Sequence, residues 1–173
     1  VNAWSGDVLP ELARRITMVR GQVLCTVPVE PFIACGFGAS FTPTGEYGQQ
    51  TVTGQVLFGG CRAIAPNHDV GVQPGEVSPE VQGALETSLG RLFPTLAGIN
   101  IERRWSGAMA FTADYLPIVV NPVPGLFAIG GFSGHGMPFA AIVGRHLAEA
   151  VQTGTIPSAL APFRIDRPTL AVE

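Results

Sequence analysis

Two segments of the chain repeat their apolar positions at the spacing of an α-helix. In the first, Ser78 stands at an N-cap position, Pro79 suits the first helical residue, and Pro94 ends the pattern. Its apolar positions are Val81, Leu85, Leu89 and Leu92. The second segment covers residues 137–153, and Gly154 ends it. Its apolar face consists of Phe139, Ile142, Val143, Leu147, Ala150 and Val151. We therefore expect two amphipathic helices.

Apolar and β-branched residues gather in five further runs, which predict strands at residues 16–29, 51–60, 99–111, 116–120 and 126–131. We expect residues 32–37 to pair with the strand at 51–60. Segments without such patterns are a short helix or turn at 8–13, loops at 66–75 and 121–125, and an irregular tail at 162–170. No βαβ alternation is long enough for a complete doubly wound domain. The fold class predicted is α+β, with a mixed, largely antiparallel sheet and flanking helices.

Composition narrows the classes of partner. Of the 173 residues, 46% are hydrophobic and 13% are charged, so we expect part of the apolar surface to lie against something outside this chain. The net charge of −3, without a basic run, argues against nucleic acid and anionic membranes as partners. No apolar run approaches the roughly 20 residues that span a bilayer, and the start lacks a signal-peptide pattern.

The cysteines and the first residue bear on location and completeness. Cys25, Cys35 and Cys61 are odd in number and widely spaced, without a Cys-x-x-Cys or Cys/His cluster. This pattern favours a reducing, cytoplasmic location and gives no indication of a metal. Because Val1 opens directly into what resembles the end of a strand and a loop, we expect the chain to be a fragment.

The stretch GGFSGHGMP at residues 130–138 joins a predicted strand to the second helix. Glycines let a ligand approach the backbone, and the unpartnered N–H groups of a helix N-terminus attract anions or electron-rich groups. Gly131, Gly134 and Gly136 give the reverse of the G-x-G-x-x-G dinucleotide spacing. Ser133 misses the G-x-S-x-G hydrolase frame by one position. On this pattern alone, a ligand site and a plain glycine turn with an exposed histidine both remain open.

Six stretches, taken together, are much more specific than this loop alone. They are residues 2–6 (NAWSG), 20–22 (RGQ), 57–60 (LFGG), 105–119 (WSGAMAFTADYLPIV), 127–151 (FAIGGFSGHGMPFAAIVGRHLAEAV) and 163–168 (FRIDRP). In this order they resemble the family of FAD-dependent amine and amino-acid oxidoreductases, the group of D-amino-acid oxidase, glycine oxidase and sarcosine oxidase. The resemblance covers nearly all of this chain but only the C-terminal, substrate-domain half of the family. The N-terminal half with its G-x-G-x-x-G is absent from the sequence.

The resemblance implies which residues bind the cofactor and the substrate. The positions that would face the isoalloxazine ring of FAD are Gly131, Phe132, Ser133, Gly134, His135, Gly136 and Met137, with Asn2, Ala3 and Trp4 on the other side. Backbone donors and the helix N-terminus would stabilise negative charge as the flavin takes a hydride, and His135 is the candidate catalytic residue. Trp105 and Met109 are candidates for the substrate pocket, although Trp105 could equally be an ordinary sheet aromatic.

Four positions depart from the family in ways that bear on chemistry. Met109 stands where glycine-oxidase-like members have an arginine for the substrate carboxylate, and Pro138 where sarcosine-oxidase-like members have a lysine for it. Ala108 stands in place of a flavin-linking cysteine, so we expect FAD to be held non-covalently. Leu57 lies near the position of the lysine thought to help oxygen react. With both cationic positions apolar, a less anionic amine, or a carboxylate held by the missing half, fits better than an ordinary α-amino acid.

The resulting interpretation is a fragment of a FAD-dependent oxidoreductase that oxidises a C–N bond of an amine or amino acid by hydride transfer. We expect residues 1–15 to end a FAD-domain segment, 16–112 to form the substrate-binding domain, and 113–173 to return to the FAD site. Alone, the chain should bind FAD weakly or not at all and lack turnover, because its partner, the N-terminal FAD-binding half, is missing. Two alternatives remain: a non-catalytic binding module or subunit that pairs with a separate FAD-binding chain, and, more remotely, a small hydrolase.

The other polar candidates are expected to be structural. Arg20 should pair with a carboxylate rather than contact a ligand. Asp114 should fix the turn before Leu116. His68 and His146 are expected at the surface or in packing.

Overall fold

The computed structural model describes residues 2–170, which group into two compact units. Unit 1 combines the residues up to Val19 with those from Met109 onward, and unit 2 is Arg20–Ala108. The division falls within two strands, β1 (Thr17–Thr26) and β5 (Ile101–Phe111). Unit 1 therefore consists of the N-terminal and C-terminal parts of the chain, and unit 2 is the continuous segment between them.

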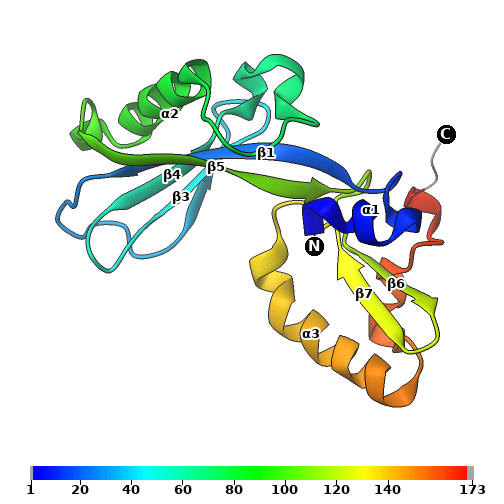
Figure 1. Ribbon diagram of the computed structural model, residues 1–173. Coiled ribbons are helices and arrows are strands. Elements are labelled where there is room, and N and C mark those ends of the chain that lie inside the picture. The colour runs from blue at the N-terminus through cyan, green and yellow to red at the C-terminus, as the bar shows by residue number, and fades with distance from the viewer. Residues whose placement is uncertain (1, 171–173) are drawn as a thin grey trace. The chain divides into compact units, whose positions relative to one another are not determined.

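An antiparallel sheet carries unit 2. In the described residues its five strands lie in the order β2–β3–β4–β1–β5, with β2 at Phe37–Ala39, β3 at Glu46–Gln50 and β4 at Val56–Gly60. The register between β1 and β4 places Leu24 opposite Phe58 and Cys25 opposite Leu57. Helix α2 (Pro79–Leu92) lies over one face of this sheet (Figure 1). The expected α+β class, with a largely antiparallel sheet, is confirmed.

The core of unit 2 lies between this face and α2. Leu24, Val56 and Phe58 are fully buried against helical side chains spaced by four residues, namely Val81, Leu85 and Leu89. Burial of each such side chain contributes about 1.5–3 kcal/mol relative to exposure. Ser78 caps the helix as predicted, because its side chain accepts from the N–H of Val81 at 3.4 Å.

In unit 2 one predicted strand is shorter than expected, and one predicted pairing is wrong. The strand expected at 51–60 begins only at Val56, because residues 51–55 close a turn in which the N–H of Thr51 donates to the carbonyl of Gln55 at 2.8 Å. Residues 32–37 do not pair with it; the neighbours of β4 are β3 and β1, and β2 begins only at Phe37. Residues 32 and 33 lie in a loop instead. The ring of Phe32 contacts that of Phe93, and Ile33 packs against the core of unit 2.

Unit 1 contains a hairpin and the second long helix. Strands β6 (Ile118–Val123) and β7 (Leu126–Gly130) pair antiparallel, with Val119 opposite Ile129 and a shift of register after Val120. Helix α3 (Gly136–Thr153) follows β7 (Figure 1) and ends at Gly154, whose φ of +74° suits a glycine C-cap. This confirms the predicted helix to within one residue. A shorter helix, α1 (Ser5–Val8), lies near the start of the chain.

Small apolar clusters and short 3₁₀ segments complete the units. In unit 1, one cluster joins Leu12, Ile118, Val120 and Leu170, and another joins Val119, Val143 and Leu160. The 3₁₀ segments are Asn2–Trp4, Pro10–Leu12, Arg62–Ile64, Pro66–Asp69, Pro94–Leu96, Ser158–Phe163 and Pro168–Leu170. Among residues 2–170, no helix has both the length and the hydropathy to cross a membrane.

Two ion pairs confirm structural roles predicted from the sequence. Arg20 binds the buried carboxylate of Asp69 through Nε at 3.1 Å and Nη2 at 2.9 Å. Asp114 accepts from the N–H of Leu116 at 3.2 Å, which fixes the turn, and also receives Nε of Arg167 at 2.6 Å. Since Arg167 sits 53 positions later, this second pair fastens the C-terminal tail to the turn. The hydrogen bonds from Arg167 hold the pKa of Asp114 well below its usual range.

Candidate functional site

The loop between β7 and α3 is a tight turn built on left-handed backbone. Gly131, Ser133 and Gly134 have φ angles of +73°, +49° and +84°. Two short backbone hydrogen bonds hold it: the N–H of Ser133 donates to the carbonyl of Ala110 at 2.7 Å, and that of His135 donates to Phe132 at 2.7 Å. A non-glycine residue in this conformation persists only where its surroundings determine it. The loop shape is therefore imposed by its contacts.

Thr112 and Ser133 form the inner side of the loop. Ser133 is 3% exposed, and its Oγ accepts from the N–H of Thr112 at 3.2 Å. The hydroxyl of Thr112 donates onward to the carbonyl of Leu116 at 2.8 Å. A Cβ on Gly131 would come within 2.6 Å of the Thr112 methyl, so only glycine fits there. The backbone N–H of Ser133, bound to Ala110, and its side-chain hydroxyl, bound to Thr112, thus both support the loop from inside.

Asn2 fastens the N-terminal segment to the same loop. Its side-chain Oδ1 accepts from the N–H of Gly131 at 3.0 Å, and its own carbonyl accepts from Ser5 Oγ at 2.7 Å. A Cβ on Gly130 would approach that Ser5 hydroxyl to 3.0 Å. Close packing of glycine backbone therefore allows the NAWSG segment to reach the loop.

The outer side of the loop is open. Gly134 and His135 are exposed, and Met137 is 90% exposed. A Cβ on Gly134 would meet no described atom within 4 Å. His135 is the N-cap of the 18-residue α3, and its side chain makes no capping hydrogen bond to the described residues. The first-turn N–H groups lack intrahelical partners and carry the positive end of the helix dipole. This surface suits the electron-rich edge of a flat group lying against glycine backbone.

The structure brings together part of the residue set predicted from the sequence. Asn2 contacts Gly131 directly, while Ala3 is half-buried and Trp4 is 43% exposed in the same 3₁₀ segment. Trp105 is 41% exposed on β5 and lines a cavity of about 470 Å³ within unit 2. Met109 is half-buried on the same strand and is not part of that cavity's lining. The roles of these residues toward a cofactor or substrate remain predictions.

Sequence reasoning missed two residues that shape the loop. Thr112 belongs to the 105–119 segment that resembles the family, two positions before Asp114, but the sequence gave no reason to expect a structural role for its side chain. Ser5 carries no pattern of its own, because its contact with Asn2 is made within a short helical turn. Neither hydroxyl is recognisable as a support before the fold joins residue 112 to residue 133.

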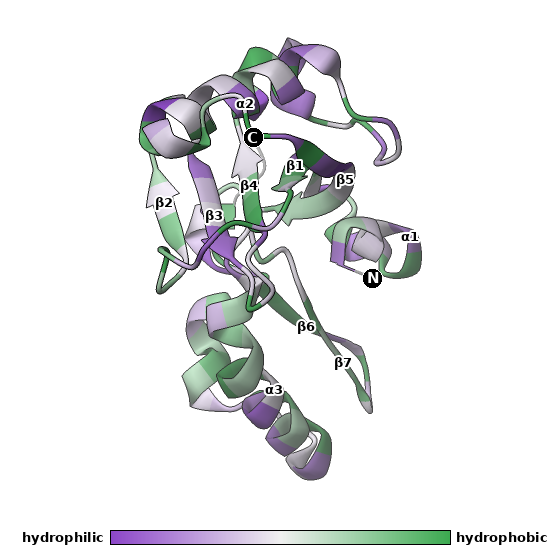
Figure 2. Cartoon of the chain, turned by 90° about the vertical axis from the view of Figure 1, so that its left-hand side faces the viewer, coloured by the Kyte–Doolittle hydropathy of each residue, from purple (hydrophilic) through white to green (hydrophobic). Residues whose placement is uncertain are grey.

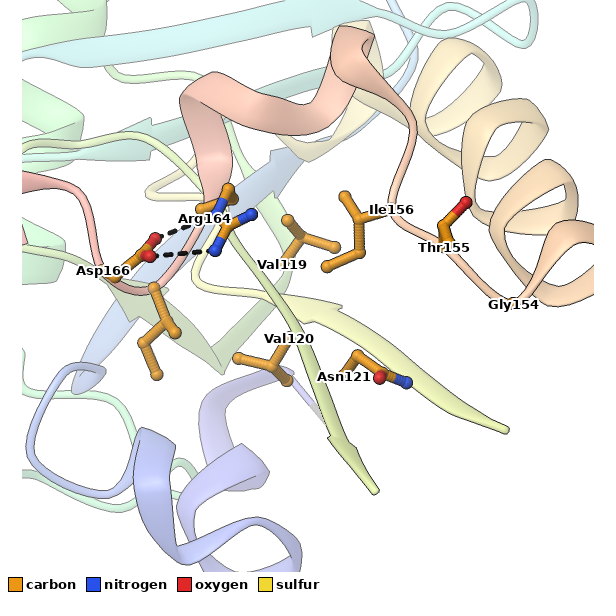
Figure 3. Close-up of a pocket in the computed structure, with 9 residues that line it drawn as sticks. Val119, Val120, Asn121, Gly154, Thr155, Ile156, Arg164 and Asp166 are labelled. Carbon is orange, nitrogen blue, oxygen red and sulfur yellow. Dashed lines mark hydrogen bonds and ion pairs between the residues drawn. The ribbon is translucent and has the colours of Figure 1, made fainter. Parts of the chain in front are cut away.

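A second cavity, also about 470 Å³, lies in unit 1 beside β6 (Figure 3). Figure 3 shows Arg164 and Asp166 pointing toward one another, and their closest ion-pair distance is 2.9 Å. Valine and isoleucine side chains form much of the remaining wall: Val119, Val120, Ile156 and Ile165. Because its charged groups already neutralise each other, this cavity offers no reactive constellation.

The thiols and carboxylates give no indication of a metal centre. Across residues 2–170, no group of three His, Cys, Asp or Glu side chains is arranged to hold a metal ion. Cys25 and Cys61 are buried, and burial raises the pKa of the Cys61 thiol to about 11. Cys35 is exposed. The loop before α3 therefore remains the principal candidate site.

Comparison with known proteins decides the family. The FAD dependent oxidoreductase family, DAO, matches residues 1–150. The chain belongs to this family. Gamma-glutamylputrescine oxidoreductase of Escherichia coli (strain K12) is 28% identical over 163 residues, which are 87% of this chain and 35% of that protein. One of the opine oxidase subunits of Agrobacterium tumefaciens (strain Ach5) is 30% identical over 92 residues, or 52% of this chain and 24% of that protein.

Solved structures share the fold of this family member. Glycine oxidase from Geobacillus kaustophilus matches with a TM-score of 0.73 and 19% identity, covering 96% of this chain and 43% of that one. L-proline dehydrogenase from P. horikoshii matches with a TM-score of 0.68 and 24% identity, covering 91% and 43%. The family is that expected from the sequence. The chain spans about a third of the length of the first curated relatives that it matches.

Proposed function

We propose that this chain is the substrate-binding half, with the returning strand, loop and helix, of an enzyme that oxidises a C–N bond of an amine or amino acid with FAD. The observation that carries the proposal is the loop before α3. It is held from inside by Asn2, Thr112 and Ser133, and it presents exposed glycine backbone and a helix N-terminus on its outer side. Membership of a FAD-dependent family supports the flavin ring as the occupant of that surface.

The residues present fit that ring. Gly134 leaves room for a flat group against the backbone, since a Cβ there would project into open space. The N–H groups of Gly136 and Met137 lie in the first turn of α3, where donors are free to face a ligand. When bound, FAD would supply the acceptor for a hydride from the carbon next to the nitrogen, and loss of a proton from that nitrogen would leave an imine for water to hydrolyse. The helix N-terminus would offer positive potential to the electron-rich edge of the ring, with His135 beside it as the candidate catalytic residue.

Attachment of the cofactor is non-covalent in this proposal. Ala108 provides no thiol for a flavin linkage, and of the three cysteines Cys25 and Cys61 are buried. The adenosine and pyrophosphate of FAD would be bound by an N-terminal half outside residues 1–173. Alone, the chain is therefore proposed to bind FAD weakly and to be inactive.

Helix α3 supports the presence of such a half. Its exposed residues include Met137, Ile142 and Val151, and Figure 2 colours much of the helix as hydrophobic. Exposed apolar side chains gathered on one element mark an interaction surface. The relatives, about three times as long as this chain, contain the additional residues that such a surface requires.

The substrate class is drawn from the relatives and from two apolar positions. The names of similar proteins include gamma-glutamylputrescine oxidoreductase, glycine oxidase and L-proline dehydrogenase, so an amine or amino acid is proposed here. Met109 and Pro138 offer no cation for a carboxylate next to the reacting carbon. We therefore favour an amine without an adjacent carboxylate.

A second candidate is a subunit that works beside a separate FAD-binding chain. Two relatives are named as subunits, one of the opine oxidase of Agrobacterium tumefaciens and one, HcnC, of the hydrogen cyanide synthase of Pseudomonas protegens. The coding region upstream of Val1 separates the two candidates. A G-x-G-x-x-G there supports one longer enzyme, and an immediate start codon supports the subunit.

Anaerobic reduction of the flavin tests the proposal. The full-length protein that contains this chain is purified, mixed with primary and secondary amines, amino acids included, without oxygen, and followed by the visible absorbance of oxidised flavin. We expect the absorbance to bleach with at least one amine and not with the corresponding alcohols. A protein that carries no flavin after incubation with FAD, or whose flavin is reduced by none of these amines, contradicts the proposal.

A further inference from the structure

The loop at residues 66–77, here called the strap, precedes α2 and contains a run of backbone that its residues disfavour. Asn67, His68 and Asp69 follow one another with φ angles of +49°, +53° and +60°. Residues other than glycine enter this left-handed region mainly one at a time, because their Cβ comes too close to the following carbonyl oxygen. Three in succession persist only where contacts elsewhere hold them.

A carboxylate anchors the strap to unit 2. Between residues 66 and 80, which the structure describes throughout, Asp69 is the only buried residue, with 2% of its surface exposed. The apolar core of unit 2 includes no side chain from the described strap. A buried carboxylate is strongly unfavourable unless it is paired, so the position of Asp69 depends on the groups that it binds. The strap is therefore anchored by a polar contact and not by the core.

Two residues of β1 supply the partners of this carboxylate. Arg20 binds it through Nε at 3.1 Å and Nη2 at 2.9 Å, and Gln22 donates to it through Nε2 at 2.9 Å. Gln22 is itself buried, and its Oε1 accepts from the N–H of Ser78 at 2.9 Å, which fixes the amide in orientation. These charge-assisted contacts offset the backbone strain next to them.

The far end of the strap is attached by exposed hydrogen bonds. Nη1 of Arg20 donates to the carbonyl of Glu76 at 2.9 Å. The Ser106 hydroxyl on β5 accepts from the N–H of Gly75 at 2.8 Å and lies 3.0 Å from its carbonyl. Water replaces exposed partners of this kind at little cost. Because Arg20 serves both ends, release of Asp69 from this side chain weakens the far attachment as well.

We propose that the strap opens as a unit while the rest of unit 2 stays folded, and that Asp69 is the latch that keeps it closed. The strain at residues 67–69 favours the open state, and the contacts of Asp69 with Arg20 and Gln22 favour the closed state. Since the core beneath α2 contains no strap residue, opening leaves that core intact. The inference concerns unit 2 alone and does not depend on the flavin chemistry proposed above.

Hydrogen exchange of the full-length protein that contains this chain, followed by mass spectrometry of its peptides, tests the latch. Asp69→Asn removes the charge and should speed exchange of the strap amides tenfold or more, whereas the amides of β4 and of the last two turns of α2 should keep the parent rate. The control is Asp166→Asn, which removes a carboxylate from an exposed pair in unit 1 and should leave the strap unchanged. Equal acceleration throughout unit 2, or none in the strap, would overturn the proposal.

Glycine substitutions at two exposed positions of the strap test the strain separately. His68 has a φ of +53°, whereas Gln73 has an ordinary, negative φ. Glycine enters the left-handed region without steric cost but loosens an ordinary position. His68→Gly should therefore slow strap exchange about threefold or more, and Gln73→Gly should speed it. When added to Asp69→Asn, His68→Gly should restore part of the lost protection. Effects of the same sign in the two glycine variants would overturn the role of strain.

Discussion

The side-chain Oδ1 of Asn2 accepts a hydrogen bond from the backbone N–H of Gly131 at 3.0 Å, across 129 positions of sequence. This contact fixes the N-terminal segment to the loop before α3. Asn2→Ala leaves the Gly131 N–H without its acceptor and should lower the free energy of unfolding by about 1 kcal/mol. Hydrogen exchange of the Gly131 amide should accelerate.

The control for this change is Asn2→Asp, which keeps an acceptor oxygen at the same position. Its Gly131 amide should stay protected. The contact would lose its assigned role if Asn2→Ala left the exchange rate of that amide unaltered.

Gly131 lies so close to the methyl group of Thr112 that no side chain fits at position 131. Gly131→Ala combines an unfavourable φ of +73° with a Cβ 2.6 Å from the Thr112 methyl, and should destabilise the chain by about 3 kcal/mol. Gly125→Ala has a similar φ of +82° but open space, so it should cost roughly 1–2 kcal/mol. Urea denaturation measures both.

Removing the obstructing methyl tests the steric part separately. Thr112→Ser keeps the hydroxyl that donates to Leu116 and deletes the colliding group. The double variant with Gly131→Ala should therefore recover about 1 kcal/mol of the loss. Strict additivity of the two single effects would show that the collision is not the cause.

The Asp114–Arg167 pair makes stability depend on pH. The pKa of Asp114 is lowered in the folded chain, so its contribution is present above the unfolded value of about 3.9 and is lost as pH falls below it. Asp114→Asn should cost about 2 kcal/mol at neutral pH. The difference from the parent chain should shrink as the pH falls below 3.9 in urea titrations.

An exposed pair provides the comparison. Asp166→Asn removes the partner of Arg164 at the surface and should change stability little at any pH. A pH-independent effect of Asp114→Asn would contradict the linkage between this carboxylate and the tail.

The three thiols should differ in reactivity. Cys35 is exposed, whereas Cys25 and Cys61 are buried with raised pKa values. An aromatic disulfide reagent at mildly alkaline pH should label one thiol rapidly in the folded chain and all three in denaturant. Cys35→Ser should abolish the rapid phase, and a rapid phase that survives this change would contradict the burial of the other two.

Local pattern was sufficient for the two long helices and insufficient for two of the five strands, β2 and β3. Ser78 and Pro79 begin α2, and Gly154 ends α3, because caps act within a few residues of the helix end. The polar strand β3 has no apolar alternation and forms through its pairing with β4. The sequence analysis therefore missed β3 and expected residues 32–37 to pair with β4 instead. A strand defined by its neighbour cannot be recognised from its own residues.

The candidate site divides in the same way. The resemblance to a flavoenzyme family indicated the loop before α3, and the family match confirms that resemblance. The supports of the loop, Thr112 and Ser5, depend on contacts between distant segments and were not foreseen.

The most direct test of the central claim, that the loop before α3 holds the flavin ring, is FAD affinity of two glycine variants in the full-length protein. Gly134 and Gly98 have φ angles of +84° and +73°, and a Cβ at either meets no described atom within 4 Å. Asparagine tolerates this backbone, so Gly134→Asn and Gly98→Asn differ mainly in where the new side chain projects. We predict FAD binding weakened about tenfold or more by Gly134→Asn and unchanged by Gly98→Asn. Equal FAD affinity in the parent and both variants would contradict the account.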